Sequence, residues 1–390
     1  MERFPRERFA VVDGGENPDA ILCRSAKIDR ESLAPSLKAI ARAGAGTDKI
    51  CVEECSNRGI PVFNTPGANA NSVKELVMLG LLLASREVIQ GVRFVGELAG
   101  KHDTSAELTR AVEKEKKRFA GIEIKGKTIG IVGLGAIGSL VADMALSMGM
   151  EVLGFDTALS VDSAWKLSNK VKKMENLATL LARSDFLTLH VPMMDSTRHM
   201  INAESLALCK KGVRLLNFSR EGIVDPQAVK RALEEGRLSR FVSDFPYRDL
   251  VGLPHVISIP HLGASTQEAE DNCAVMASDQ LIDFLENGNI ENSVNFPNLH
   301  MERTGAYRFT FTNLNVPTML KQVLALLADS RINVSDMTNK SRERAASNII
   351  DTEQPIPKET VDRIEAIEGI HIVRTLPVRV AGETGTETGA

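Results

Sequence analysis

A glycine-rich hexapeptide, Gly133-Leu-Gly-Ala-Ile-Gly138, constrains what this chain can fold into more than any other segment. The apolar run 128–132 leads into it, and a helical pattern over 139–148 follows it. A second apolar run, 151–155, ends at Asp156. Glycine triplets alone arise by chance, but a strand, a glycine loop, a helix and a second strand ending at an acidic residue follow the order of a dinucleotide-binding βαβ unit.

The three glycines of this loop match three steric demands of such a unit. Gly133 permits the tight turn after the strand, Gly135 lets a pyrophosphate approach the backbone, and Gly138 lets the helix pack on the strand. At the start of the helix, around Ala136 and Ile137, free N–H groups and the positive end of the helix dipole favour phosphate binding. We therefore predict a dinucleotide site here.

Asp156 predicts which dinucleotide is bound. Its carboxylate can accept hydrogen bonds from both ribose hydroxyls and would repel a 2′-phosphate, which favours NAD over NADP. An ordinary βαβ turn followed by a surface aspartate is the alternative that needs no ligand. We expect NAD to be the cofactor.

Composition and charge narrow the class of protein. A chain of 390 residues is long for one core, so two or three domains are expected. The net charge of −4 argues against nucleic acid or an anionic membrane as a partner, and the longest apolar run, 76–84, is too short to span a bilayer. Five scattered cysteines and the absence of a visible secretory signal favour the cytoplasm. Cys51 and Cys55 lack a second ligand pair, so we expect no metal site.

The middle of the chain predicts an α/β fold. Apolar strands recur with helical patterns between most of them, which indicates a doubly wound parallel sheet covered on both faces. The expected strands are 128–132, 151–155, 186–191, 213–218, 241–245 and 256–260, and a helix over 266–287 closes this part.

The first part of the chain also alternates short strands, at 20–24 and 61–64, with helices. A helix expected over 72–85 is apolar almost all round, which predicts that it is buried. Residues 93–120 are polar and charged, which predicts a solvated helix.

A separate unit is expected after the turn-rich linker 287–297. Its pattern is strand, helix, two strands, helix and strand, which is the ferredoxin-like βαββαβ order. The expected elements are strands at 307–312, 332–338, 345–351 and 371–377 and helices at 317–329 and 359–368. This unit carries no catalytic cluster, so we predict a regulatory or assembly module. We expect the tail that follows it, 381–390, to be disordered.

Three polar residues follow strands at the edge where open α/β sheets bind ligands. They are Arg220, Asp244 and His261. Hydride transfer from an alcohol carbon to NAD needs a base for the hydroxyl proton, and histidine suits that role. It also needs a cation for a substrate carboxylate, and arginine offers a planar fork. His190 also ends a strand, and we expect it to pack near the adenine rather than react.

At this point the chain resembles the D-2-hydroxyacid dehydrogenases. The resemblance spans about residues 20–378 and is carried by seven segments: Cys23-Arg-Ser-Ala26, Arg42-Ala-Gly-Ala-Gly-Thr-Asp48, Asn64-Thr-Pro-Gly-Ala-Asn69, the glycine loop, Leu189-His-Val-Pro192, Asn217-Phe-Ser-Arg220 with Val224-Asp225, and Pro260-His-Leu-Gly-Ala-Ser-Thr266. The resemblance implies four regions: a discontinuous substrate domain (1–92 and 264–297), a Rossmann NAD-binding domain (93–263), an ACT-like domain (304–380) and the tail (381–390).

The resemblance also implies roles for matching residues. Arg220 would hold the substrate carboxylate, with the N–H groups around Ala45 and Gly46, and His261 would be the base in oxidation. Asp244 would hold the nicotinamide amide. The further positions implied to line the cofactor are Val191, Phe218, Ser219, Gly263 and Ala264, and those implied to line the substrate are Arg24, Ser25, Arg42 and Asn69.

Two departures from the family pattern lie close to these residues. Asp249 stands where relatives have a glutamate that orients the histidine, so a hydrogen bond from it to His261 would be longer or need a backbone shift. Glu221 stands where relatives have glycine, so we expect backbone strain there or a negative charge near the substrate, unless its side chain points outward.

The ACT-like unit of relatives binds amino-acid effectors. The matching positions here are Asn313, Asn315 and Asn333, although Asn313 replaces a histidine and Thr318 a glycine found in some relatives. Serine is the effector that this resemblance implies, and a homo-oligomer, a dimer or a tetramer, is expected.

The implied activity is NAD-dependent oxidation of 3-phosphoglycerate to 3-phosphohydroxypyruvate, the first step of serine biosynthesis. Two arginines aimed at one pocket suit a substrate with a phosphate besides its carboxylate. The sequence leaves open another D-2-hydroxy acid as substrate, and a non-enzymatic NAD-binding regulator on the same fold.

Overall fold

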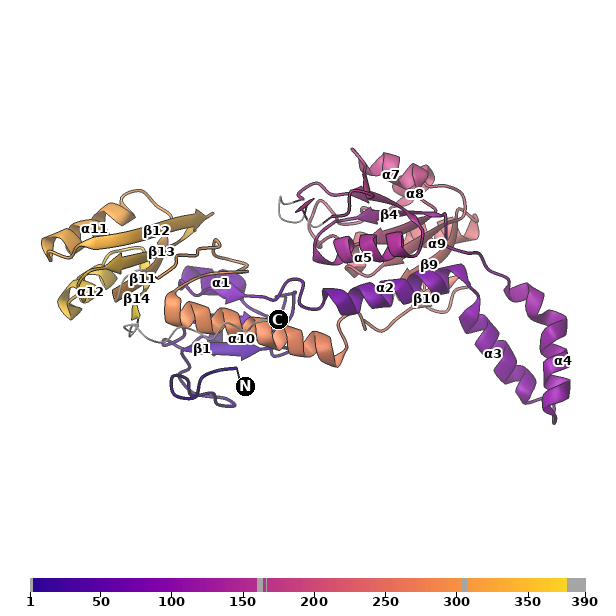
Figure 1. Ribbon diagram of the computed structural model, residues 1–390, viewed down its shortest axis with the longest axis horizontal. Coiled ribbons are helices and arrows are strands. Elements are labelled where there is room, and N and C mark those ends of the chain that lie inside the picture. The colour runs from indigo at the N-terminus through magenta and orange to yellow at the C-terminus, as the bar shows by residue number, and fades with distance from the viewer. Residues whose placement is uncertain (1–2, 160–163, 166, 304–306, 377–390) are drawn as a thin grey trace. The chain divides into compact units, whose positions relative to one another are not determined.

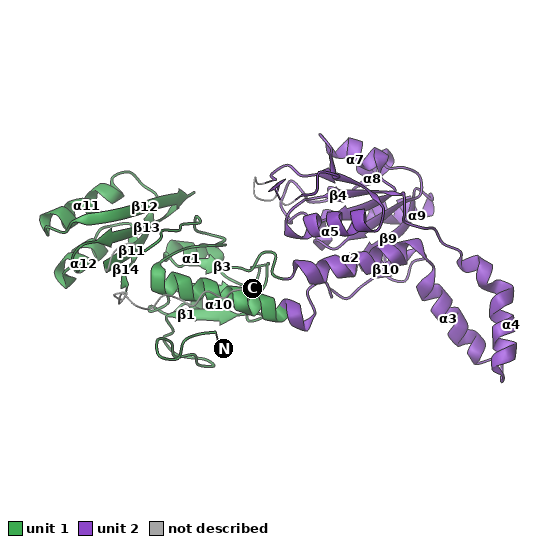
Figure 2. Ribbon diagram, in the orientation of Figure 1, with its two compact units in different colours: residues 1–68, 270–390 green, residues 69–269 purple. Residues whose placement is uncertain are grey.

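The structure is a computed structural model that describes residues 3–159, 164–165, 167–303 and 307–376. The chain divides into two compact units (Figure 2). Unit 1 contains residues 1–68 and 270–390, and unit 2 contains residues 69–269. The predicted tail at 381–390 lies outside the described residues.

Unit 2 is built on a seven-stranded sheet in which every pair of neighbouring strands is parallel. This confirms the doubly wound Rossmann fold. The strands, in sheet order, are β10 (Val256–Ser258), β9 (Leu238–Ser243), β8 (Val213–Asn217), β7 (Phe186–Leu189), β4 (Thr128–Val132), β5 (Glu151–Phe155) and β6 (Lys172–Lys173). The strand order reverses between β4 and β7, because the chain builds outward from β4 in both directions.

Helices cover both faces of this sheet because its strands are apolar on both sides. Alternate residues separate into two cores: Ile129 and Ile131 pack with α2 (Ala70–Ser85) and α5 (Ala136–Ser147). Leu187 and Leu189 pack with the opposite helices, which are α7 (Leu177–Arg183), α8 (Ala203–Leu208) and α9 (Pro226–Glu234).

Side chains at the N-termini set where these three opposite helices begin. Asn176 accepts a hydrogen bond from the Thr179 N–H at the start of α7. Asn202 and Ser205 form a capping box at α8, and Asp225 caps α9 ahead of a proline at its first position. Each cap satisfies N–H groups that would otherwise lack a partner.

Helix α2 is buried on one face only, so the prediction of a helix buried all round is wrong. Gly80 faces the sheet, where an added Cβ would lie 2.7 Å from the Phe218 ring. On the other side Met78, Leu79 and Leu82 are exposed.

Residues 93–120 were predicted as one solvated helix, and they form most of two. These are α3 (Val88–Ala99) and α4 (Ser105–Glu115), followed by the 3-10 turn η2 (Lys116–Phe119). Both helices extend away from the sheet of unit 2 and bury almost nothing except Phe94 (Figure 1). Thr104 caps α4 by accepting from the Glu107 N–H.

The first part of unit 1 is a three-stranded parallel sheet with helices beside it. Its elements are β1 (Ala20–Cys23), η1 (Arg30–Ser32), β2 (Ala39–Arg42), α1 (Val52–Asn57), β3 (Val62–Phe63) and the long α10 (Gln267–Asn287). Strand β2 was not predicted. One face of the sheet packs on α10, where Phe63 contacts Phe284 with ring centroids 5.6 Å apart.

The C-terminal part of unit 1 has the predicted βαββαβ order. Its antiparallel sheet has the order β12-β13-β11-β14. The elements are β11 (Tyr307–Leu314), α11 (Met319–Asp329), β12 (Val334–Arg342), β13 (Ala345–Thr352), α12 (Lys358–Glu365) and β14 (Ile370–Leu376). Phe309 and Phe311 face the helices, and the alternate residues of β11 face the rest of unit 1.

A fully buried arginine, Arg308, forms an ion pair within this module and also binds the chain that precedes it. The Arg308 guanidinium donates to both carboxylate oxygens of Asp351, at 2.7 and 2.9 Å. Its other N–H groups donate to the carbonyl oxygens of Asn287, Met301 and Glu302. One arginine therefore fixes two strands of the module and the chain that leads into it.

We expect Asp351→Asn to lower the free energy of unfolding by about 3–5 kcal/mol, because it leaves the Arg308 charge buried without its counterion. Denaturant titration measures this loss. Asp362→Asn in the same module is the control: Asp362 pairs with Lys358 at the surface, where an ion pair contributes little to stability. Equal losses in both variants would contradict the role given to Arg308.

Candidate active site

The predicted ligand-binding residues gather at one edge of the seven-stranded sheet. Because all its strands are parallel, the carboxyl ends of β4, β7, β8, β9 and β10 meet at the same edge. The glycine loop leaves β4 at this edge, beside the point where the strand order reverses. Arg220, Asp244 and His261 follow β8, β9 and β10 there.

Two glycines of the loop have no room for a side chain. Gly133 has a φ of 91°, and an added Cβ would lie 2.5 Å from the His190 carbonyl oxygen. A Cβ at Gly138 would lie 1.9 Å from the Gly133 carbonyl oxygen. The absence of side chains at these two positions lets the turn approach the start of α5 and the segment after β7.

Gly135 differs, because an added Cβ would meet nothing within 4 Å. Its side of the loop is open, and α5 begins directly after it with the N–H groups of Ala136 and Ile137. A phosphate can therefore approach the backbone and the positive end of the helix at this point, so the loop fits the pyrophosphate of a dinucleotide.

Asp156 ties the end of β5 to this loop. Its Oδ2 accepts from the Leu134 N–H at 2.7 Å, and its Oδ1 accepts from the Ala158 N–H at 2.8 Å. Each carboxylate oxygen has a second lone pair, so hydrogen bonds from ribose hydroxyls remain available.

Asp244 is buried beneath the loop that carries His261. Its carboxylate accepts from the N–H groups of Leu262 and Gly263, at 2.7 and 2.8 Å, and only 2% of the residue is exposed. Burial raises the pKa of Asp244, while the two N–H groups and the nearby His261 act in the opposite direction. A nicotinamide amide bound at Asp244 would donate to carboxylate oxygens that already accept from the N–H groups of this loop.

His261 is exposed and has an unusual backbone conformation. Its φ is 57°, in the left-handed region, and its N–H donates to the Asp244 carbonyl oxygen at 2.9 Å. The imidazole packs against the Phe245 ring with centroids 4.8 Å apart. Non-glycine residues adopt this conformation only where the surrounding structure holds them in it, and such residues are common at functional sites.

The structure does not join Asp249 to His261. Asp249 is exposed, and its Oδ2 accepts from the Gln227 amide of α9 at 2.8 Å. Within the described residues no hydrogen bond or ion pair links it to the imidazole. The pairing of Asp249 with His261 therefore stays a prediction.

Arg220 is exposed, and its guanidinium donates to the Ser219 carbonyl oxygen at 2.7 Å. Among the described residues it has no carboxylate partner. Glu221 is also exposed and begins the 3-10 turn η3 (Glu221–Ile223). Its backbone is outside the left-handed region, so the strain considered for a residue in place of glycine does not arise.

A buried hydrogen-bond network that sequence reasoning missed supports the Arg220 loop. The Asn217 amide donates to the Arg220 carbonyl oxygen and to the Tyr247 hydroxyl, both at 2.9 Å. The Tyr247 hydroxyl donates to the Glu221 carbonyl oxygen at 2.7 Å, and burial raises its pKa. The signal was present in the sequence, since Tyr247 is one of only two tyrosines and lies between Asp244 and Asp249.

The remaining residues expected near the cofactor differ in where they point. The Ser219 hydroxyl donates to the Val191 carbonyl oxygen, which links the ends of β8 and β7. The Phe218 ring packs under α2 in the core. An added Cβ at Gly263 would lie 2.8 Å from the Asp244 Oδ2, and Ala264 is half-buried beside it.

His190 bonds with the Thr188 hydroxyl through Nε2 at 2.9 Å. Burial lowers the pKa of His190 to about 3, so its imidazole is neutral near pH 7. This charge state fits a packing role, and the expected place near the adenine stays a prediction.

The substrate-lining residues expected in the first part of the chain lie in unit 1, apart from Asn69, which is the first residue of unit 2. Arg24 forms a two-point ion pair with Glu270, with both N–O distances at 2.5 Å. Arg42 donates to the carbonyl oxygens of Arg24 and Gly46 and so joins two loops.

The neighbouring positions of this region are held through their backbones. The Ser25 carbonyl oxygen accepts from the Lys49 ammonium at 3.2 Å, and that of Ala45 from the Asn64 amide at 2.7 Å. Arg24, Ser25, Ala45 and Gly46 thus form one connected surface in unit 1, with Arg42 linking its loops.

Two searches limited to the described part of the chain were negative. No cluster of three or more His, Cys, Asp or Glu side chains there could hold a metal ion. None of the helices described is long and apolar enough to cross a membrane.

Comparison with known proteins decides the family. Residues 92–263 match the model of the D-isomer specific 2-hydroxyacid dehydrogenase NAD binding domain. D-3-phosphoglycerate dehydrogenase of Haemophilus influenzae is 30% identical over 88% of this chain and 82% of its own length. The chain belongs to the D-isomer specific 2-hydroxyacid dehydrogenases. The sheet and glycine loop of unit 2 are therefore the NAD-binding domain of this family.

Two further relatives bear the same name. D-3-phosphoglycerate dehydrogenase of Methanocaldococcus jannaschii is 35% identical over 82% of this chain, but the match covers 59% of that protein, so this chain spans about three fifths of its length. Among solved structures, NAD+-bound 3-phosphoglycerate dehydrogenase of Entamoeba histolytica is 27% identical with a TM-score of 0.56, covering 71% of this chain and 82% of that one.

We expect Tyr247→Phe to lower the free energy of unfolding by about 1–2 kcal/mol, because the Asn217 amide and the Glu221 carbonyl oxygen lose their shared partner. Denaturant unfolding measures the loss. Tyr307→Phe is the matched control, because the Tyr307 hydroxyl makes no hydrogen bond within the described residues. A loss no larger than in the control would remove Tyr247 from the support of the Arg220 loop.

Proposed function

We propose that this protein catalyses the NAD-dependent oxidation of 3-phosphoglycerate to 3-phosphohydroxypyruvate. One observation carries the chemistry: Arg220, which has no carboxylate partner among the described residues, and the exposed His261 follow β8 and β10, on either side of β9, at the edge that holds the NAD loop. The names of the relatives support 3-phosphoglycerate as the substrate, and the Haemophilus influenzae protein matches along most of its length. The cytoplasm is the expected compartment.

In this mechanism the substrate carboxylate binds the exposed guanidinium of Arg220, one N–H of which donates to the Ser219 carbonyl oxygen, while Asn217 holds the Arg220 backbone through its carbonyl oxygen. The His261 imidazole would accept the proton of the substrate hydroxyl. When bound, NAD would supply the acceptor for the hydride on the carbon that bears this hydroxyl. Asp244 fixes the loop of His261 through two backbone N–H groups. Asp249, if it moves toward His261, would stabilise the imidazolium.

The phosphate of the substrate needs cations besides Arg220. Arg24 and Arg42 are the proposed ones, and both are engaged in this structure, Arg24 with Glu270 and Arg42 with backbone carbonyl oxygens. A phosphate at Arg24 would compete with Glu270 for the guanidinium. Selectivity for a phosphorylated substrate over other D-2-hydroxy acids would then depend on the strength of this ion pair.

His261→Ala should lower kcat by about 10²–10⁴, the usual contribution of a general acid–base group. Steady-state turnover with NAD and 3-phosphoglycerate measures it, and NAD binding by fluorescence should survive. Near-normal turnover of the His261→Ala variant would contradict the role of His261 as the base. If the unaltered protein binds NAD but shows no turnover, the result would favour a non-enzymatic NAD-binding regulator. If it turns over only another D-2-hydroxy acid, that acid would take the place of 3-phosphoglycerate as the proposed substrate.

Apolar side chains on two helices of unit 2 support a homo-oligomer. Met78, Leu79 and Leu82 are exposed on α2, and Val92 and Val95 on α3, where Val92 is 68% exposed. Large apolar side chains that gather on the surface in this way are typical of association sites. A second copy of the chain is the proposed partner.

Val92→Asp combined with Val95→Asp should shift the protein toward monomer, because burying two carboxylates opposes association. Light scattering after size-exclusion chromatography gives the mass. The same two valines changed to threonine serve as the milder control and should retain most of the oligomer. A monomeric unaltered protein would contradict the proposal directly.

The C-terminal module is the proposed ACT-like effector domain, with serine as effector. The Asn313 amide is buried and bonds with Asn348 and the Leu314 carbonyl oxygen. Asn315 is exposed and donates to the Glu343 carbonyl oxygen, and Asn333 is exposed near Gln354. Asn315 and Asn333 are thus the two that solvent can reach.

Serine should bind the full chain and lower turnover without competing with NAD, with a coupling of about 1–3 kcal/mol. Calorimetry with and without Asn333→Ala measures the binding, which this variant should weaken. Asp362→Ala, on α12 of the same module, is a control, because the Asp362 carboxylate pairs with Lys358 and not with the proposed contacts. Serine binding that is unchanged in Asn333→Ala would place the effector elsewhere.

A further inference from the structure

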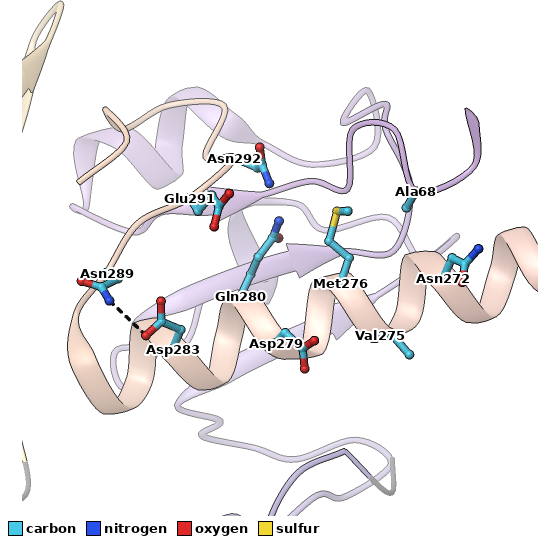
Figure 3. Close-up of a pocket in the computed structure, with 10 residues that line it drawn as sticks. All are labelled: Ala68, Asn272, Val275, Met276, Asp279, Gln280, Asp283, Asn289, Glu291 and Asn292. Carbon is cyan, nitrogen blue, oxygen red and sulfur yellow. Dashed lines mark hydrogen bonds between the residues drawn. The ribbon is translucent and has the colours of Figure 1, made fainter. Parts of the chain in front are cut away.

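A pocket of about 600 Å³ in unit 1 is used by nothing proposed above (Figure 3). One side is α10, and the other is formed by residues 289–292 after it and by Ala68. The pocket therefore lies along the helix that leads into the C-terminal module. Its residues include none of those assigned to NAD, substrate or effector.

Gln280 is the group in this pocket that lacks a partner. Its side chain rises from α10 into the space beside Met276 and Asn292 (Figure 3). Only 8% of the residue is exposed, and neither its amide nitrogen nor its amide oxygen has a hydrogen-bond partner in the described structure. A buried amide without partners destabilises the folded protein, so a ligand group that donates to its oxygen and accepts from its nitrogen would be stabilised there.

The charge of the pocket determines which ligands can bind. Asp279 is neutralised by a two-point ion pair with Arg3. Asp283 uses one oxygen to accept from Asn287 and Asn289, and within the described residues its other oxygen and both those of Glu291 accept no hydrogen bond. The lining residues include no lysine, arginine or histidine. The pocket therefore attracts a cation, and it would repel the carboxylate of a free amino acid.

We propose that this pocket binds a small aliphatic amine cation that also carries a carboxamide. The ammonium would lie between Glu291 and the free oxygen of Asp283, and the carboxamide would pair with Gln280 through one donor and one acceptor. Val275 and Met276 supply apolar surface for the methylene chain. A metal ion is a poorer occupant, because the described residues offer no cluster of three metal-binding side chains.

Calorimetry on the full-length protein at low salt tests this with three probes. L-lysinamide has both groups, cadaverine has the ammonium groups without the carboxamide, and butyramide has the carboxamide without a charge. We expect L-lysinamide to bind at least about tenfold more tightly than either fragment, because each fragment loses one set of contacts, and to weaken as salt is raised. Equal binding of butyramide, or no binding of L-lysinamide, would overturn the proposal.

Two variants locate the binding. Gln280→Met should weaken L-lysinamide about tenfold or more, and Glu291→Gln about threefold. Glu268→Gln, which removes the same charge from α10 outside the pocket, should leave the affinity unchanged. Unchanged binding in Gln280→Met would place the ligand elsewhere and refute the site.

The Gln280→Met variant has a second readout that needs no ligand. If the amide is unpartnered, an apolar side chain of similar shape should leave the melting temperature unchanged or raise it. A fall of several degrees would show that the amide is hydrogen-bonded within the protein, and would remove the reason for a ligand at this position.

Discussion

The close contact between the glycine loop and the segment after β7 is the constraint on which the NAD-binding unit depends. A Cβ at Gly133 would lie 2.5 Å from the His190 carbonyl oxygen, so the ends of β4 and β7 can approach only because no side chain stands between them. This approach occurs where the strand order reverses and where the sheet opens to a ligand. The same absence of side chains leaves the backbone beside Gly135 open. The glycines of this loop thus allow both the close approach of the two strand ends and the access of a ligand to the backbone.

The rest of the site is held by backbone hydrogen bonds to buried polar side chains. Asp244 holds the His261 loop and Asn217 holds the Arg220 loop, while the side chains that would meet substrate remain exposed. This division has a physical reason. A buried polar group with all its partners is rigid, whereas a side chain in solvent stays free to bind an incoming anion or proton.

Much of the fold followed from the sequence because apolar runs and glycines act locally. Strands β4 and β5 have the bounds that their apolar runs predicted, and the C-terminal module has the predicted order of elements. Strand β2 was missed because its four residues offer no alternation, and the exposed face of α2 was missed because an apolar pattern does not reveal whether a neighbour covers it.

The candidate site was harder to predict, because its support comes from contacts between distant segments. The residues after β4, β8, β9 and β10 were placed at one edge by the parallel order alone. Tyr247 reaches the Glu221 backbone across 26 positions of sequence, and no local pattern encodes that hydrogen bond. Asp249 shows the converse: its position next to a family motif implied a bond to His261, but in this structure its carboxylate bonds with Gln227.

The carboxylate of Asp156 has a consequence for attempts to change which dinucleotide this protein accepts. Because it also accepts from the Leu134 N–H of the glycine loop, its replacement by a residue suited to a 2′-phosphate would remove an acceptor from the loop that we expect to bind the pyrophosphate. A redesign at this one position would therefore weaken the binding of both dinucleotides while it changes the preference between them. A second substitution that restores an acceptor for the Leu134 N–H would be needed to separate cofactor choice from loop order.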